Sequence, residues 1–269
     1  MEMKWSPYNA TNSVYLRSQS TKEGAIVEFA TFDFFKFKPV TAHLIKSMAG
    51  STIWCAQPSR LNDPFDCQIN LQGSFARAAA KSSRAHKKWL EQFLDDATFF
   101  EVWAKMFEQV GVCSFSLNLY NALMWSHYAD EHKGVCLLYR FSENFFADPT
   151  SKIIGVDKVR YEADVLTDWL LDNPPTDDLY ELRVKLTEIY LTAKAPDWSY
   201  EQESRIVRFN HGLFKIPRES LIQICFGLRT PEADIARIKE AVSESGSQIQ
   251  FCQIVRDPAN DFGITAVET

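Results

Sequence analysis

DWSYEQESRIVR, residues Asp197–Arg208, is the stretch that most strongly indicates the fold of this chain. It is rich in aromatic and β-branched residues, which favour extended backbone, so it predicts a β-strand. Side chains of a strand alternate between its two faces, so Glu201, Glu203 and Arg205 would share one face. Two adjacent carboxylates repel each other unless a cation, a partner or a substrate compensates their charge. This face is therefore either a salt-bridged edge or part of a reaction centre.

Around this stretch, helical and strand patterns follow each other without strict alternation. Strands are predicted at residues 32–37, 52–56, 110–116, 134–139, 156–161, 201–209, 221–226 and 249–255, and helices at 42–48, 76–107, 121–128, 178–192 and 231–245. This mixture predicts an α+β fold with mixed, mostly antiparallel sheets and flanking helices. Because no repeat or linker divides the chain, we expect a single domain over residues 31–269, preceded by an N-terminal extension over residues 1–30.

The composition places the chain among ordinary globular proteins. Its 269 residues are 46% apolar, which suffices for a substantial core, and its net charge of −6 argues against a broad nucleic-acid footprint. The six cysteines form no CxxC pair, and we expect them to be free and buried. No signal peptide or membrane span is recognisable, so a cytoplasmic protein in a reducing compartment is expected.

Two motifs in the first quarter of the chain carry polar side chains. Lys36 alternates with phenylalanines in a predicted strand and, taken alone, is most simply a solvated lysine. The turn around Asn62 and Asp63 is made rigid by the proline that follows. Asp63 and Asp66 could bind a cation or a ribose hydroxyl, or hydrogen-bond to their own backbone.

A third motif packs aromatic and imidazole side chains into residues 125–132. Zinc-binding helices place two histidines four apart, whereas His127 and His132 are five apart, and no third ligand is evident. We therefore predict no metal site. A catalytic base, a phosphate donor and a buried hydrogen-bond network remain open alternatives.

These motifs together resemble a mostly bacterial family known as domain of unknown function 2971. The resemblance spans roughly residues 32–230 and rests on five segments, at residues 35–37, 61–66, 124–134, 198–205 and 226–229.

The order strand, short helix, glycine, strand near the N-terminus also resembles the start of ADP-ribosyltransferases that modify DNA and RNA. In those enzymes an aromatic–His pair on the first strand binds NAD, and here Phe35 and Lys36 stand at that position, with Lys in place of His. Glu201 and Glu203 look like their paired glutamates, of which the second is catalytic. The resemblance implies NAD as a substrate and an ADP-ribosyltransferase-like fold.

The resemblance also implies roles for individual residues. Glu203 would stabilise the cation that develops when the nicotinamide–ribose bond breaks, and Glu201 would deprotonate the acceptor. His127 is a third candidate catalytic residue, and Lys36 or Arg205 would bind the pyrophosphate. The candidate cofactor-binding residues are Lys36, Phe35, Asn62, Asp63, Trp125, Tyr128 and Arg205.

Such an enzyme would suit a bacterial toxin or phage-defence effector that modifies a nucleic acid or a protein. An antitoxin or other inhibitory partner would keep it silent, and no membrane would be involved.

Two other classes of function remain open. A metal-dependent hydrolase or nuclease would gather its cation with Asp63, Asp66, Glu201, Glu203 and His127. A non-catalytic interaction module would bind a nucleotide through the same polar residues without turnover.

Overall fold

The computed structural model describes residues 14–20, 26–173, 175–176, 178–245 and 248–269. Within them the main sheet has nine strands. These strands are β1 (Val14–Ser20), β2 (Ile26–Lys38), β4 (Val110–Ser116), β5 (Val135–Ser142), β6 (Ile153–Lys158), β9 (Glu203–Phe209), β11 (Leu221–Phe226), β12 (Gln250–Arg256) and β13 (Ile264–Glu268). Their order is β13-β12-β11-β5-β2-β4-β9-β6, and β1 pairs with β2.

All neighbouring strands of this sheet are antiparallel except β11 and β12. The predicted mixed, mostly antiparallel α+β fold is therefore confirmed. Within the predicted extension, β1 and the start of β2 belong to this sheet, while residues 1–13 and 21–25 lie outside the described part of the chain.

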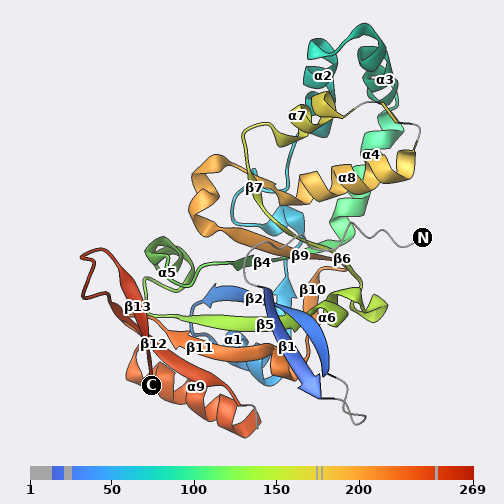
Figure 1. Cartoon of the computed structure of the whole chain (residues 1–269). Coiled ribbons are helices and arrows are strands. Elements are labelled where there is room, and N and C mark those ends of the chain that lie inside the picture. The colour runs from blue at the N-terminus through green and yellow to red at the C-terminus, as the bar shows by residue number, and fades with distance from the viewer. Residues whose placement is uncertain (1–13, 21–25, 174, 177, 246–247) are drawn as a thin grey trace.

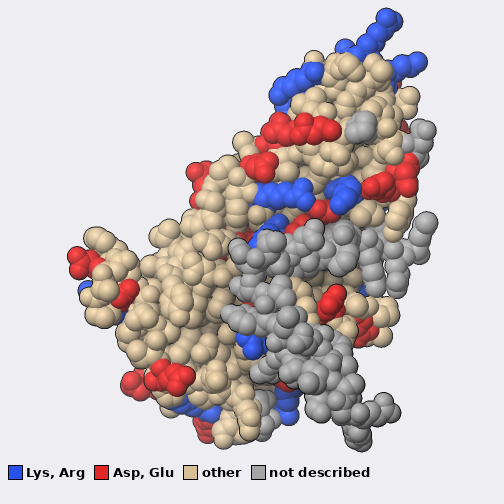
Figure 2. Space-filling view, in the orientation of Figure 1, with Lys and Arg blue, Asp and Glu red and all other residues tan. Residues whose placement is uncertain are grey.

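Nine helices flank the sheet within the described residues. They are α1 (Ala42–Ala49), α2 (Leu71–Lys81), α3 (Arg84–Leu94), α4 (Ala97–Gln109), α5 (Ala122–Tyr128), α6 (Glu143–Ala147), α7 (Val165–Asp172), α8 (Leu179–Thr192) and α9 (Glu232–Ser245). Figure 1 shows α2, α3, α4, α7 and α8 gathered into a helical unit above β9 and β6, with α1 and α9 at the opposite end of the molecule. Figure 2 shows Lys and Arg side chains at the far end of this helical unit, with both signs of charge interspersed elsewhere on that face.

Shorter elements connect these layers. They are the strands β3 (Thr52–Cys55), β7 (Arg160–Tyr161), β8 (Ala193–Lys194) and β10 (Gly212–Lys215), and the 3-10 helices η1 (Pro58–Arg60), η2 (Pro149–Ser151), η3 (Pro196–Glu201) and η4 (Arg218–Ser220). β3 pairs with β10, and β7 pairs with β8.

The main sheet opens between β2 and β4. β2 pairs with β5 from Thr31 to Lys38 and β4 pairs with β9 along its whole length, but β2 and β4 share the single pair Phe35 and Ser116. The apolar core around Phe34 spans both halves of the sheet, whereas a second core, around Phe75 and Leu182, packs the helical unit against β4, β6 and β9. The divergence of the two strands leaves polar side chains between the halves.

Some predicted boundaries are wrong. The single helix expected at residues 76–107 is three helices, because the side chains of Ser83 and Asp96 cap new helices by accepting hydrogen bonds from backbone amides of their first turns. The helix α7 and the strands β1, β10 and β13 were not predicted at all.

Two of the six cysteines also differ from expectation. Cys225 and Cys252 form a disulfide, whereas Cys55, Cys67, Cys113 and Cys136 are free and buried as predicted. The two bonded cysteines are directly opposite each other on the parallel strands β11 and β12. Because they are 27 residues apart in the sequence, no local pattern indicates that they meet.

Within the described residues, no helix has both the length and the apolar character needed to cross a membrane.

Close backbone approaches fix the loop that precedes β5 against the end of β2. Gly134→Ala should lower the free energy of unfolding by about 1 to 3 kcal/mol, because a Cβ there would lie 2.3 Å from the carbonyl oxygen of Lys38. Gly50→Ala is the control, since its Cβ would lie 3.1 Å from the Lys46 carbonyl and its φ of −80° is helical. Urea denaturation of both variants measures the difference, and equal losses would contradict this account.

Candidate functional site

A cavity of about 200 Å³ lies where β2 and β4 diverge, and we call it the polar pocket. Its polar lining residues are Lys36, Lys38, Asn62, Asp66, Ser114, Ser116, Tyr128, Lys194, Glu201 and Glu203. They come from β2, β4, the loop after η1, α5, β8, η3 and β9. Apolar residues such as Phe35 and Met124 complete the lining.

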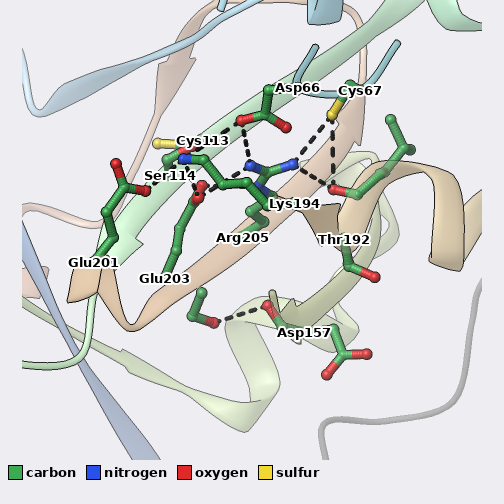
Figure 3. Close-up of polar contacts among 12 residues, drawn as sticks. Asp66, Cys67, Cys113, Ser114, Asp157, Thr192, Lys194, Glu201, Glu203 and Arg205 are labelled. Atoms are coloured by element: carbon green, nitrogen blue, oxygen red, sulfur yellow. Dashed lines mark hydrogen bonds and ion pairs between the residues drawn. The ribbon is translucent and has the colours of Figure 1, made fainter. Parts of the chain in front are cut away.

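One side of the polar pocket is a cluster of buried charges, which we call the buried ion cluster: Asp66, Lys194, Glu201, Glu203 and Arg205. Figure 3 shows the cationic groups of Lys194 and Arg205 directed at the carboxylates. Arg205 Nε lies 2.7 Å from Glu203 Oε1, and its Nη2 lies 2.6 Å from Asp66 Oδ2. Lys194 Nζ binds Glu201, and also lies 3.1 Å from Glu203 Oε2 and 3.5 Å from Asp66 Oδ2.

The charges of this cluster do not balance. Every member is at least nine-tenths buried, and Arg205 is fully buried. Three carboxylates face two cations, so the fully ionised cluster carries one excess negative charge. Taking charges out of water is costly unless partners compensate them, so the cluster favours a ligand group that is cationic or that donates hydrogen bonds. Asp66 Oδ1 supports this, because it is buried without a hydrogen-bond partner among the described residues.

The two glutamates differ in their acidity. Burial opposes the ionisation of Glu203, but Arg205 and Lys194 outweigh it and lower its pKa to about 2. Burial raises the pKa of Glu201 above its usual value, and Lys194 and Tyr128 offset only part of that effect. Glu203 is thus a permanent carboxylate at neutral pH, and Glu201 is the more basic of the two.

Hydrogen bonds hold Glu201 in place. The Tyr128 hydroxyl donates to Glu201 Oε1, and Asn62 Nδ2 donates to the Tyr128 hydroxyl at 3.2 Å. Burial and the Glu201 hydrogen bond raise the pKa of Tyr128, so its hydroxyl keeps its proton. Ser116 Oγ donates to the backbone carbonyl of Glu201 at 2.8 Å. These contacts join α5, β4 and η3 around one carboxylate.

Seven of the residues predicted from the sequence line the polar pocket: Phe35, Lys36, Asn62, Asp66, Tyr128, Glu201 and Glu203. Arg205 lies behind the carboxylates, and its guanidinium donates to Glu203, Asp66 and the Leu191 carbonyl oxygen. It therefore positions Glu203 and has no donor free to bind a pyrophosphate.

Three other predicted residues lie outside the pocket lining. His127 is exposed, with its ring centroid 6.1 Å from that of Tyr200. Trp125 is fully buried and donates its indole N–H to the Leu119 carbonyl oxygen. Asp63 accepts a hydrogen bond from the Phe65 amide and so closes its own turn. Trp125 and His127 lie behind the lining residues Phe37 and Tyr128, with ring centroids 5.1 Å and 6.5 Å apart.

Two features of the site were missed. Lys194 was not singled out, although a lone lysine in the otherwise uncharged run Leu191–Ala195 is a recognisable sign of a buried ion pair. The strand was expected to begin at Glu201, but it begins at Glu203, since Gln202 adopts the left-handed conformation with φ of 44°. Glu201 therefore reaches the pocket from the end of η3, and not by strand alternation.

Acid should weaken the folded state through Glu203. Because its folded pKa is depressed, it contributes about 3 kcal/mol of stability above its unfolded pKa of 4.5, and this is lost as the pH falls toward about 2. Glu203→Gln should therefore be less stable than the wild type by about that amount at pH 7, with a difference that shrinks below pH 4.5.

The matched control is the exposed Glu101→Gln, which should change stability little at any pH. Guanidinium denaturation between pH 3.5 and 7 provides the measurement. A difference between the wild type and Glu203→Gln that does not vary with pH would show that Glu203 is not held as a carboxylate.

Comparison with known families gives a match over part of the chain. A family model described as "Protein of unknown function (DUF2971)" matches residues 124–206 and confirms the predicted resemblance. No curated protein and no solved structure is significantly similar to the chain. The matched segment runs from α5 to β9 and contains Tyr128, Lys194, Glu201, Glu203 and Arg205. Over residues 124–206 this chain is therefore similar to the family of proteins of unknown function DUF2971.

Proposed function

We propose that the polar pocket binds NAD and that the protein transfers ADP-ribose to an acceptor. The observation that carries this proposal is the excess negative charge of the buried ion cluster on the pocket wall. Breaking the nicotinamide–ribose bond develops positive charge on the ribose. A fixed, desolvated anion beside that charge stabilises the transition state more than the ground state.

The two glutamates fit two different steps. Glu203, with a pKa of about 2, is ionised throughout the reaction and faces the developing cation. Nicotinamide leaves with the electrons of its bond to the ribose, and the acceptor forms the new bond at the same carbon. Glu201, with its raised pKa, takes the proton that the acceptor loses. Neighbouring groups whose pKa values are driven apart are typical of such a division of roles.

The remaining pocket residues suit the cofactor. Phe35 and Lys36 on β2 reach the same pocket as the glutamates, as the resemblance to ADP-ribosyltransferases implies. Asp66 Oδ1 offers an acceptor for a ribose hydroxyl, a role considered for Asp63 and Asp66 from the sequence. Asn62 and Tyr128 add donors at the edge of the pocket.

The other two functions have less support. For a hydrolase, the carboxylates of Asp66, Glu201 and Glu203 are held by ammonium and guanidinium groups, and within the described residues no set of three or more His, Cys, Asp or Glu side chains is arranged to hold a metal. A non-catalytic nucleotide-binding module is favoured by one observation, the bidentate pairing of Glu203 with Arg205. Binding of NAD without turnover would identify that case.

Glu203→Gln should reduce the release of nicotinamide from NAD by about 10²- to 10³-fold, because it removes the charge that stabilises the ribosyl cation. Glu101→Gln, which removes an exposed carboxylate that is not part of the pocket lining, should retain full activity. Chromatography of the reaction measures nicotinamide with and without nucleic-acid or protein acceptors. A wild-type protein that neither binds nor consumes NAD would rule the proposal out.

We propose that the cellular role is that of a toxin or phage-defence effector, with an antitoxin as inhibitory partner. Expression should then slow growth, and Glu203→Gln should cure the defect. Equal growth of cells expressing either form would speak against this role.

Tyr128→Phe tests the assignment of Glu201 as the base. The substitution removes the hydroxyl that donates to Glu201 Oε1, which raises the pKa of Glu201 further. The acid limb of the pH profile of kcat/KM should therefore move up by about one pH unit. An unchanged limb accompanied by lower kcat would assign the base to another group.

A further inference from the structure

We propose that Lys36 and Lys38 form a diphosphate-binding subsite on the β2 side of the polar pocket. Both residues line the pocket, and both lie on the same face of β2 because they are two apart in a strand. Their Cα atoms are about 7 Å apart at ordinary strand spacing. This inference rests on the proposed function only in identifying the whole ligand as a dinucleotide. The experiment that tests it measures pyrophosphate binding and does not depend on that function.

Within the described residues, neither lysine forms an ion pair with an Asp or Glu side chain. Lys36 Nζ donates to the Ser114 carbonyl oxygen at 2.7 Å and to Cys113 Sγ at 3.5 Å, and it lies 4.7 Å from the centre of the Phe115 ring. These contacts orient its ammonium group. Burial opposes ionisation of the Cys113 thiol, but a hydrogen bond with Cys55 and the charge of Lys36 outweigh it and lower its pKa to about 6, so the thiol compensates part of the Lys36 charge. Lys38 makes no side-chain hydrogen bond or ion pair with the part of the chain that the structure describes.

The carboxylates that line the pocket are already engaged elsewhere. Asp66, Glu201 and Glu203 are held by Lys194, and two of them also by Arg205. The pocket is thus divided into an acidic side at β8 and β9 and a basic side at β2. A ligand that fills both sides carries a cationic or hydroxyl-bearing part and an anionic part.

The two ammonium groups also disfavour each other. The charge of Lys36, together with burial, lowers the pKa of Lys38 to about 8. An anion between them would relieve this repulsion and would accept a charge-assisted hydrogen bond from each. Two adjacent phosphate groups match two separate ammonium groups better than one phosphate does, so the subsite should prefer a diphosphate.

The test uses inorganic pyrophosphate and orthophosphate as probes, with titration calorimetry on the full chain. The wild type should bind pyrophosphate at least about tenfold more tightly than orthophosphate. Lys38→Met should weaken pyrophosphate binding about tenfold or more and remove the preference, and Lys38→Arg should restore much of it. Lys36→Met should have a similar effect. The exposed Lys81→Met, which removes the same charge outside the pocket lining, should bind both probes as the wild type does.

Two outcomes would overturn the inference: pyrophosphate binding no tighter than orthophosphate binding, or Lys38→Met binding pyrophosphate as tightly as the wild type. Circular dichroism checks that each variant is folded. If Lys36→Met does not fold, Lys38→Met alone still tests the inference. Lys38-dependent binding in a protein that never releases nicotinamide would support the subsite while contradicting the proposed transferase activity.

Discussion

The guanidinium of Arg205 joins segments that are far apart in the chain. From the centre of β9 it binds Glu203 two residues away, Asp66 in the loop after η1 and the carbonyl oxygen of Leu191 at the end of α8. Because the guanidinium is fully buried, removing one of these partners would leave a buried charge unpaired and lower the free energy of unfolding by several kcal/mol. The positions of the loop, the helical unit and the strand β9 are therefore coupled through one side chain.

That coupling also sets the chemistry of the pocket. Arg205 and Lys194 keep Glu203 ionised, and by sharing two cations among three carboxylates they leave Glu201 with a raised pKa. The stability of the fold and the acidity of the pocket carboxylates thus depend on the same contacts. The cost of burying five charged groups is offset by their mutual attraction, except for one negative charge that a ligand can neutralise.

The polar pocket extends beyond the segment that matches the family model. Residues 124–206 supply Tyr128, Lys194 and both glutamates, but Asp66 comes from the loop after η1 and Lys36 from β2. The acidic side of the pocket therefore depends mostly on the family segment, whereas the basic side depends on β2. The opening of the sheet between β2 and β4 allows both sides to face one cavity.

The sequence by itself determined much of the secondary structure and the mostly antiparallel α+β class, because hydrophobic periodicity and capping residues are local signals. It also singled out the motifs that carry Lys36, Asn62, Tyr128, Glu201 and Glu203, since charged and aromatic residues in predicted strands and turns are conspicuous.

Tertiary structure alone decided which of these side chains meet. In the folded chain Asp63 accepts a hydrogen bond from the Phe65 amide within its own turn, and His127 is exposed. Asp66 binds Arg205, although the two residues are 139 positions apart in the sequence. It also placed Lys194 among the carboxylates and paired Cys225 with Cys252. The physical reason is that ion pairing and burial depend on distances in space, and no local pattern encodes contacts between segments so far apart in the chain.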